Sequence, residues 1–186
     1  MDAPAHAPDP DAEAERLRRA RRGDGAAFEA LYHDHARAVH ALAFRLTGNA
    51  AEAEDIVQET FLRMFGFLSG LCENTPLRPW LKRGAANLAI DRVRRQQHPG
   101  TDMALAALAD TASASPADAA DADTLLRRLP PLARTVVWLH EMEGWSHEDL
   151  GRRFGRTASW SKSLMSRSLA RLRQDLDPHG DAPHDV

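Results

Sequence analysis

The stretch from Leu150 to Arg173 constrains this chain most, because it carries seven Lys or Arg residues and no Asp or Glu. The whole chain, by contrast, has a formal net charge of -3. The stretch follows a predicted helix cap at Ser146 and is interrupted by Gly155, so it has the outline of a helix-turn-helix. A basic helix in an acidic chain indicates a polyanionic partner, with DNA the leading candidate and a solvated surface face the alternative.

The bulk composition limits the class of protein. A chain of 186 residues with 43% hydrophobic content can form one medium domain or two small ones. The single cysteine, Cys72, excludes an intramolecular disulfide and a cysteine-rich zinc site. The polar, Pro-rich N-terminus does not resemble a secretory signal, and no window has the apolar length of a membrane span. We therefore expect a cytoplasmic protein with no membrane insertion.

Charge alternates in blocks along the chain. Residues 76–95 contain six basic residues and one acidic residue, whereas residues 98–123 contain five aspartates and no Lys or Arg. The last ten residues add three more aspartates. Two separated basic blocks are consistent with two contact points on one polyanion, although one block could equally be surface decoration.

Apolar residues recur at helical spacing, and no segment shows the alternation of a strand. We predict helices at about 11–22, 28–46, 51–68 and 77–96, and further helices after 124. The predicted fold is all-α, with two small helical domains joined by a flexible acidic linker, the second domain containing the helix-turn-helix. The predicted boundaries are a disordered N-terminus at 1–10, a first domain at 11–97, the linker at 98–123, a second domain at 124–176 and an acidic tail at 177–186.

The final helix is expected to begin near Thr157 and to have one apolar face. Helical geometry predicts a core stripe of Met165, Leu169, Leu172 and Leu176. The opposite side then carries Arg156, Ser159, Ser163, Arg167 and Arg171, with Trp160 and Leu164 among them. Residues near the start of the helix can reach base edges, and the later arginines can hold phosphates. For Trp160 and Leu164, contact with thymine methyls, with a neighbouring helix or with a protein partner all remain open.

Two segments together resemble a bacterial RNA polymerase sigma factor of the extracytoplasmic-function (ECF) type. The first, Ala53–Phe61 with Pro76–Leu81 and Asn87–Arg95, resembles the second conserved region of that family. The other, Leu129–Pro131 with Glu143–Leu150 and the Lys162, Ser163 and Arg167 positions, resembles the fourth region. The two segments occur in order and at normal spacing, which is far more specific than a lone helix-turn-helix.

The resemblance implies a promoter-specificity subunit that directs promoter recognition, promoter melting and transcription initiation. It implies no enzyme activity, no cofactor and no metal. The first domain would dock on the β′ clamp helices and open the -10 element, and the second would read the -35 element as duplex. The implied partners are core RNA polymerase (β′ clamp helices and β subunit), promoter DNA and an anti-sigma factor. An acidic linker suits a basic channel toward the RNA exit path, although an ordinary solvated linker would look the same.

The resemblance also assigns roles to individual residues. The implied polymerase-binding residues are Asp55, Gln58, Glu59 and Phe61, with Ile56 or Val57 turned inward. The implied -10 contacts are Leu71 and Asn87 for a flipped base, and Arg83, Arg92, Arg94 and Arg95 for backbone phosphates. The implied -35 contacts are Arg156, Ser159, Trp160, Lys162, Ser163, Arg167 and Arg171. For Trp80, core packing is favoured over base stacking.

Some positions depart from the family pattern. Leu71 stands where an aromatic residue is common, and Gly84 and Ala86 replace a branched apolar and a basic residue. Ser161 and Leu164 replace the usual apolar and arginine residues of the recognition helix. These departures suggest an unusual promoter preference or weak recognition of the upstream element.

Two other classes of function are weighed against a sigma factor. The runner-up is a stand-alone helix-turn-helix regulator that does not depend on core polymerase. An enzyme would need a site, and His33, Asp34, His35 and His40 could bind a metal. The sequence lacks an HExxH pair, a phosphate-binding glycine loop and a convincing nucleophile group, so a solvated or partner-facing histidine cluster is favoured. Cys72 is interpreted as an inert loop cysteine rather than a redox-sensitive thiol.

Overall fold

The structure is a computed structural model that describes residues 9–72, 75–96 and 122–176. Over these residues every regular element is a helix, and none of the helices is long and apolar enough to cross a membrane. The chain divides into two compact units. The first comprises the described residues up to Phe44 together with Asn49–Leu88, and the second comprises Arg45–Gly48 and the described residues from Ala89 onward. The long helices α2 and α4 contribute to both.

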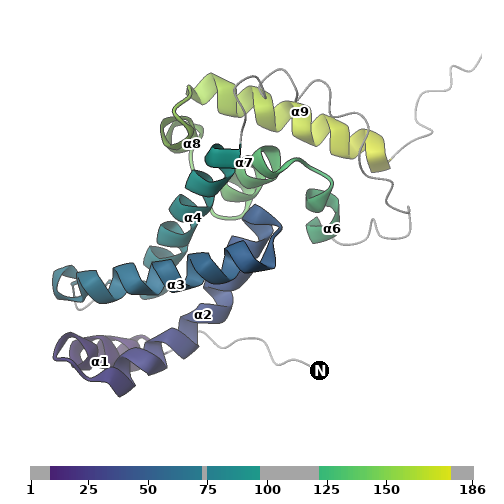
Figure 1. Cartoon of the computed structure of the whole chain (residues 1–186). Helices are drawn as coiled ribbons and strands as arrows, with labels where there is room; N and C mark the ends of the chain where they lie inside the picture. The colour runs from purple at the N-terminus through teal and green to yellow at the C-terminus, as the bar shows by residue number, and fades with distance from the viewer. Residues whose placement is uncertain (1–8, 73–74, 97–121, 177–186) are drawn as a thin grey trace, which may run out of the picture. The chain divides into compact units, whose positions relative to one another are not determined.

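The helices follow the sequence-based prediction closely (Figure 1). They are α1 (Pro10–Arg21), α2 (Gly25–Thr47), α3 (Ala50–Phe67), the 3-10 helix η1 (Leu68–Gly70), α4 (Leu77–Gln96), α6 (Ala122–Arg127), α7 (Pro131–Glu141), α8 (His147–Phe154) and α9 (Ala158–Leu176). Most of the predicted disordered N-terminus, most of the predicted linker and the acidic tail lie outside the described residues. Where the predicted ranges are described, α1 begins at Pro10 and α6 at Ala122.

Short polar side chains set the starts of several helices. The Asn49 carboxamide accepts a hydrogen bond from the Glu52 amide at 3.2 Å and caps α3. The Ser146 hydroxyl accepts one from the Asp149 amide at 3.0 Å and caps α8. Each cap satisfies an amide that has no partner within its own helix. The capping motif predicted at Ser146 therefore fixes where α8 begins.

The first unit has an apolar core formed by the inner faces of its helices. The buried side chains of α2 include Leu31, Val39 and Leu42, and those of α3 include Ile56 and Val57. Leu77, Leu81 and Leu88 of α4 are buried as well. Burial of each such side chain stabilises the fold by about 1.5–3 kcal/mol relative to exposure. The prediction that Ile56 or Val57 lies inside is confirmed for both.

The histidines of α2 do not form the surface cluster that the sequence suggested. His35 is 1% exposed, and its Nε2 lies 2.9 Å from a carboxylate oxygen of Glu13 on α1. The other oxygen of Glu13 accepts a hydrogen bond from the Leu77 amide at 3.3 Å, so one carboxylate links three helices. His33 is exposed, and His40 stacks on Phe44. Among the described residues no group of three or more His, Cys, Asp or Glu side chains could hold a metal ion.

The second unit is centred on α7. Every residue of this helix from Leu132 to Leu139 is buried; Pro130 is its N-cap and Pro131 its first residue. Arg134 is among the buried residues, and burial lowers the pKa of its guanidinium. Its Nη2 and the Thr135 hydroxyl both donate to the Leu46 carbonyl, at 3.5 and 3.2 Å. These bonds satisfy a carbonyl at the end of a helix, where no further turn supplies a donor.

The buried face of α9 differs from the predicted one. The buried residues are Ser161, Leu164, Ser168 and Leu172. Of the predicted stripe, Leu172 is therefore confirmed, whereas Met165 and Leu169 are half-buried and Leu176 is 50% exposed. Two serines can face the core because their hydroxyls have partners: Ser168 donates to the Leu164 carbonyl at 2.8 Å, and Ser161 lies 3.1 Å from the His147 ring. Apolar periodicity alone does not detect a stripe in which every second member is serine.

The observed buried face of α9 changes the interpretation of two residues. Leu164 belongs to the core and not to the outward face. Trp160 is half-buried and packs against Phe154, with the ring centroids 5.5 Å apart. Of the three readings for Trp160, the structure favours packing on a neighbouring helix.

Candidate functional site

The helix-turn-helix is built from α8 and α9 around two glycines. Gly155 ends α8 with a φ of 67°, a left-handed conformation that costs glycine little. Gly151 is buried, and a Cβ at this position would lie 2.7 Å from the Thr157 carbonyl carbon. The Thr157 hydroxyl then accepts a hydrogen bond from the Trp160 amide at 3.1 Å at the start of α9. The absence of a side chain at Gly151 therefore allows the turn to pass directly over α8.

The outward side of α9 presents polar and basic groups. We define the recognition face as Ser159, Lys162, Ser163 and Arg167, all of which are exposed. Ser159 and Ser163 lie opposite the buried stripe, and Ser166 lies within about 60° of both. Ser166 is exposed too but was missed from the sequence; its i+3 spacing from Ser163 is the signal that could have identified it. Hydroxyl, ammonium and guanidinium groups are the donors that bind base edges and phosphates.

The other predicted -35 residues flank this face. Arg156 is exposed in the turn between α8 and α9, whereas Trp160 and Arg171 are half-buried. The predicted -35 residues therefore lie at the start of α9 and along one side of it, and Trp160 and Arg171 are less accessible than the others.

The predicted -10 residues are spread over the loop before α4 and over α4 itself. Arg83 is exposed, and Asn87 and Arg92 are half-buried. Arg94 donates to the Arg153 carbonyl at 3.2 Å, and Arg95 donates to the Asp91 carbonyl at 3.3 Å. Leu71 is only 4% exposed, so its side chain belongs to the buried core. A base cannot stack on Leu71 while that side chain stays in the core.

An exposed aromatic surface lies close to Leu71 in the chain. The rings of Phe67 and Trp80, which we call the aromatic pair, are almost parallel, with centroids 6.5 Å apart. Phe67 is 54% exposed and lies over Gly70, where a Cβ would come within 2.8 Å of its ring. Phe67 was missed from the sequence because it follows Met64 and Thr60 at the i+3 and i+7 spacing of the buried face of α3, so it looks like a core residue and no local signal marks it as exposed. Trp80 is half-buried, so it is not the core residue that was predicted.

The predicted polymerase-binding residues lie on α3. Asp55 and Gln58 are exposed, and Glu59 is half-buried and paired with Arg63 at 2.5 Å. Phe61 is 4% exposed, so most of its ring is covered by the first unit. The predicted polymerase-binding residues therefore comprise three polar side chains on or near the surface and one buried aromatic side chain, Phe61.

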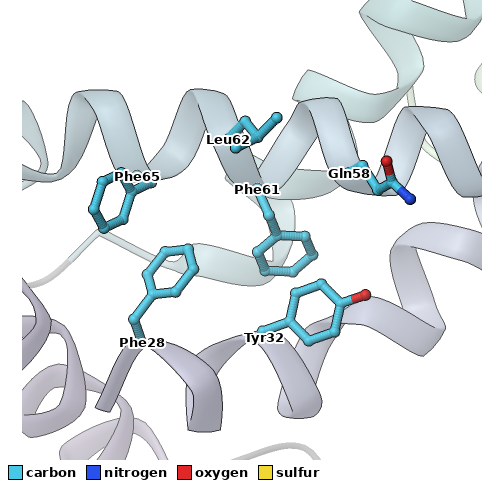
Figure 2. A pocket seen from close by; sticks show the side chains of 6 residues that line it. All are labelled: Phe28, Tyr32, Gln58, Phe61, Leu62 and Phe65. Carbon is cyan, nitrogen blue, oxygen red and sulfur yellow. The ribbon is translucent and has the colours of Figure 1, made fainter. Parts of the chain in front are cut away.

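Phe61 forms part of an apolar groove between α2 and α3 (Figure 2). The aromatic groove has a volume of about 480 Å³ and is lined by Phe28, Tyr32, Gln58, Phe61, Leu62 and Phe65. The Tyr32 and Phe61 ring centroids lie 4.7 Å apart, and those of Phe28 and Phe65 lie 5.3 Å apart. Leu62 and Phe65 are 70% and 62% exposed. Soluble domains rarely leave such side chains together on the surface unless a partner covers them.

Comparison with known protein families accounts for both units. Residues 31–98 match the Sigma-70 region 2 family, and residues 120–172 match the Sigma-70 region 4 family. The chain is 34% identical over 173 residues to the ECF RNA polymerase sigma factor SigE of Mycolicibacterium smegmatis, which covers 84% of this chain. It belongs to the ECF family of RNA polymerase sigma factors. The expected family and the expected all-helical fold are thereby confirmed.

Other similarities of this ECF sigma factor support the assignment. The chain is 35% identical over 168 residues to the RNA polymerase sigma factor CarQ of Myxococcus xanthus, covering 86% of this chain and 95% of CarQ. It spans 65% of the length of SigE. The structure of CnrH in complex with the cytosolic domain of CnrY has the same fold, with a TM-score of 0.51 and 23% identity, over 91% of this chain and all of that chain.

Proposed function

We propose that this chain directs core RNA polymerase to promoters, acting by binding and without covalent chemistry. The observation that carries the proposal is the presence, in one sigma-family chain, of a helix-turn-helix with a basic outward face and of a separate acidic and apolar face on α3. The first face suits DNA and the second suits a protein. A stand-alone regulator needs only the first, so binding of core polymerase through α3 distinguishes the two functions.

The α3 face is assigned to polymerase. Its carboxylates, Asp55 and Glu59, suit a basic partner, and the aromatic groove offers apolar contact area beside them. A helix of the β′ clamp with basic and apolar side chains fits this combination. In this assignment Phe61 forms part of the groove wall. The exposed Leu62 and Phe65 contribute most of the apolar area that polymerase would bury on binding.

The loop and helix around the aromatic pair are assigned to the melted -10 element. Leu71 is replaced in this role by Phe67 and Trp80, because an exposed ring can stack on an unpaired base and a buried leucine cannot. Asn87 remains the candidate for hydrogen bonds to a base edge. Arg83, Arg92, Arg94 and Arg95 remain the candidates for phosphates.

The aromatic pair yields a test of promoter opening. Phe67→Ala is expected to reduce open-complex formation about tenfold, because loss of one stacking contact costs about 1–3 kcal/mol. Permanganate reactivity of unpaired thymines in complexes with core polymerase measures the effect. Leu176→Ala, which removes another exposed apolar side chain, is the control. Equal reactivity for the Phe67 variant and the control contradicts the stacking role.

The recognition face is assigned to the -35 duplex, and salt distinguishes its members. Arg167→Ala is expected to weaken binding to all duplexes and to reduce the slope of log affinity against log salt by about one. Ser163→Ala is expected to leave that slope unchanged and to alter the preferred bases. Fluorescence anisotropy on duplexes selected from a random-sequence pool measures both. An unchanged slope for Arg167→Ala contradicts the assigned face.

We further propose that an anti-sigma factor controls this chain, and that both units act in the cytoplasm, where core polymerase is found. Support comes from CnrH, a protein of the same fold that forms a complex with the cytosolic domain of CnrY. Co-purification of the tagged chain from its own host, with and without added core polymerase, tests this. A partner displaced by core polymerase supports the proposal, whereas a chain that co-purifies only with polymerase under every growth condition contradicts it.

A further inference from the structure

Two histidines stack at the corner where α7 meets α8. The rings of His140, near the end of α7, and His147, the first residue of α8, have centroids 4.1 Å apart and an interplanar angle of 18°. Neither residue belongs to the recognition face or to the aromatic groove. We call these two residues the histidine pair.

Each ring of the pair is oriented by a hydrogen bond on its Nδ1 atom. The Nδ1 of His140 lies 2.7 Å from the Trp145 carbonyl oxygen, which can only accept, so this nitrogen carries a hydrogen. The Nδ1 of His147 lies 3.1 Å from the hydroxyl of Ser161, which is fully buried on α9. The pair therefore connects the end of α7, the start of α8 and the buried side of the recognition helix.

We propose that the histidine pair is a pH-sensitive latch on the recognition helix, which holds α9 in its DNA-reading position at neutral pH and loosens it in acid. Two protonated imidazoles stacked at this distance repel each other. Relief of that repulsion requires one ring to leave the stack. Movement of His147 would break its hydrogen bond with Ser161. That hydrogen bond is one of the contacts between α8 and α9.

Desolvation and two nearby positive charges favour the neutral form of His147. From α7 it is faced by His140 and by Glu141, and from α9 by Lys162, while Glu148 and Asp149 follow it on α8. Desolvation lowers the pKa of His147 below its ordinary value of 6.5, and the positive charges of His140 and Lys162 lower it further, against an opposing effect of Glu141. Between the lowered pKa of His147 and 6.5, the unfolded chain binds more protons than the folded chain. The contribution of neutral His147 to folding stability is therefore fully present above about pH 6.5 and is lost as the pH falls through the folded pKa.

Proton binding and DNA binding are then linked. If the neutral pair holds α9 in place, acid weakens duplex binding, and by reciprocity a bound duplex lowers the pKa of His147 further. This inference rests on the proposed function only in assigning α9 to duplex DNA. The titration of the histidines in the free chain does not depend on that assignment.

The test uses the full chain and a short duplex recovered from a random-sequence pool at pH 7.5. Between pH 7.5 and 5.5 at constant ionic strength, the affinity of the wild-type chain is expected to fall about fivefold more than that of His147→Asn. The asparagine side chain can place a polar atom near the Ser161 hydroxyl, and it does not titrate, so this variant keeps the neutral-pH affinity. His33→Asn, at an exposed position on α2, is the matched control and should behave like the wild-type chain.

Histidine NMR of the isotopically labelled wild-type chain provides a readout that needs no variant to fold, with His147→Asn and His140→Asn serving only to identify resonances. The expected result is a His147 midpoint below 6.5 that falls further when duplex is added. A midpoint at the ordinary value, or equal loss of affinity in the wild-type chain and His147→Asn, overturns the latch. A chain that binds no duplex at pH 7.5 contradicts the proposed function instead, and the His147 midpoint in the free chain then decides the pair by itself.

Discussion

Leu62→Lys is expected to weaken binding of core RNA polymerase by about 100-fold, a loss typical of a central interface residue. Leu62 is 70% exposed on α3 and borders the aromatic groove, so the substitution removes apolar contact area without disturbing the core. It also places a positive charge where the proposed partner surface is basic. Competition for core polymerase against a labelled sigma factor measures the effect.

The control for this prediction is Met142→Lys, which makes a similar exchange at an exposed apolar residue in the second unit. Core binding by this variant should match that of the wild-type chain. Asp55→Arg, which reverses a charge on the same face as Leu62, should weaken binding as well. If both α3 variants bind core polymerase as tightly as the control does, the polymerase face has been assigned to the wrong surface.

Gly151→Val is expected to destabilise the second unit by about 3 kcal/mol, near the upper end of what overpacking costs. The new side chain would meet backbone atoms of Thr157 and Ala158, which cannot move aside as a flexible side chain can. The turn would then shift away from α8 and carry the start of α9 with it. Urea unfolding followed by tryptophan fluorescence measures the loss, and the affinity for duplex DNA should fall in parallel.

Gly66→Val is the matched control, since Gly66 also lies within a helix but a Cβ added there would have no neighbouring atom within 4 Å. Replacing a helical glycine in open space should leave stability unchanged or raise it slightly. If the Gly66 and Gly151 variants unfold at the same urea concentration, the close approach of the turn to α8 does not matter for stability.

The helices and the family were predictable because their signals are local. The Ser146 cap, Gly155 and the Pro130-Pro131 pair each mark a helix boundary through backbone chemistry that neighbouring residues supply. Apolar spacing then predicted the helix at 28–46, although the sequence did not show that His35 would be buried against Glu13.

The errors arose where tertiary contacts decide. Ser161 and Ser168 face the core because each hydroxyl finds a partner there, and no spacing rule on apolar residues detects this. The family resemblance assigned Leu71 to a flipped base and therefore to the surface, yet its side chain is buried. Conversely, Phe28 and Phe65 look like core residues in a helical pattern but line an open groove. Membership of the core depends on which elements cover a side chain, and that information is not local.

The most direct test of the central proposal is run-off transcription with purified core RNA polymerase on fragments of the host genome. The wild-type chain is expected to start RNA synthesis at a specific set of sites that core polymerase alone does not use. Leu62→Lys and Arg167→Ala should each lose most of this activity, the first through polymerase binding and the second through DNA binding. An intact, inhibitor-free preparation of the chain that starts no transcript on any fragment would contradict the proposed function.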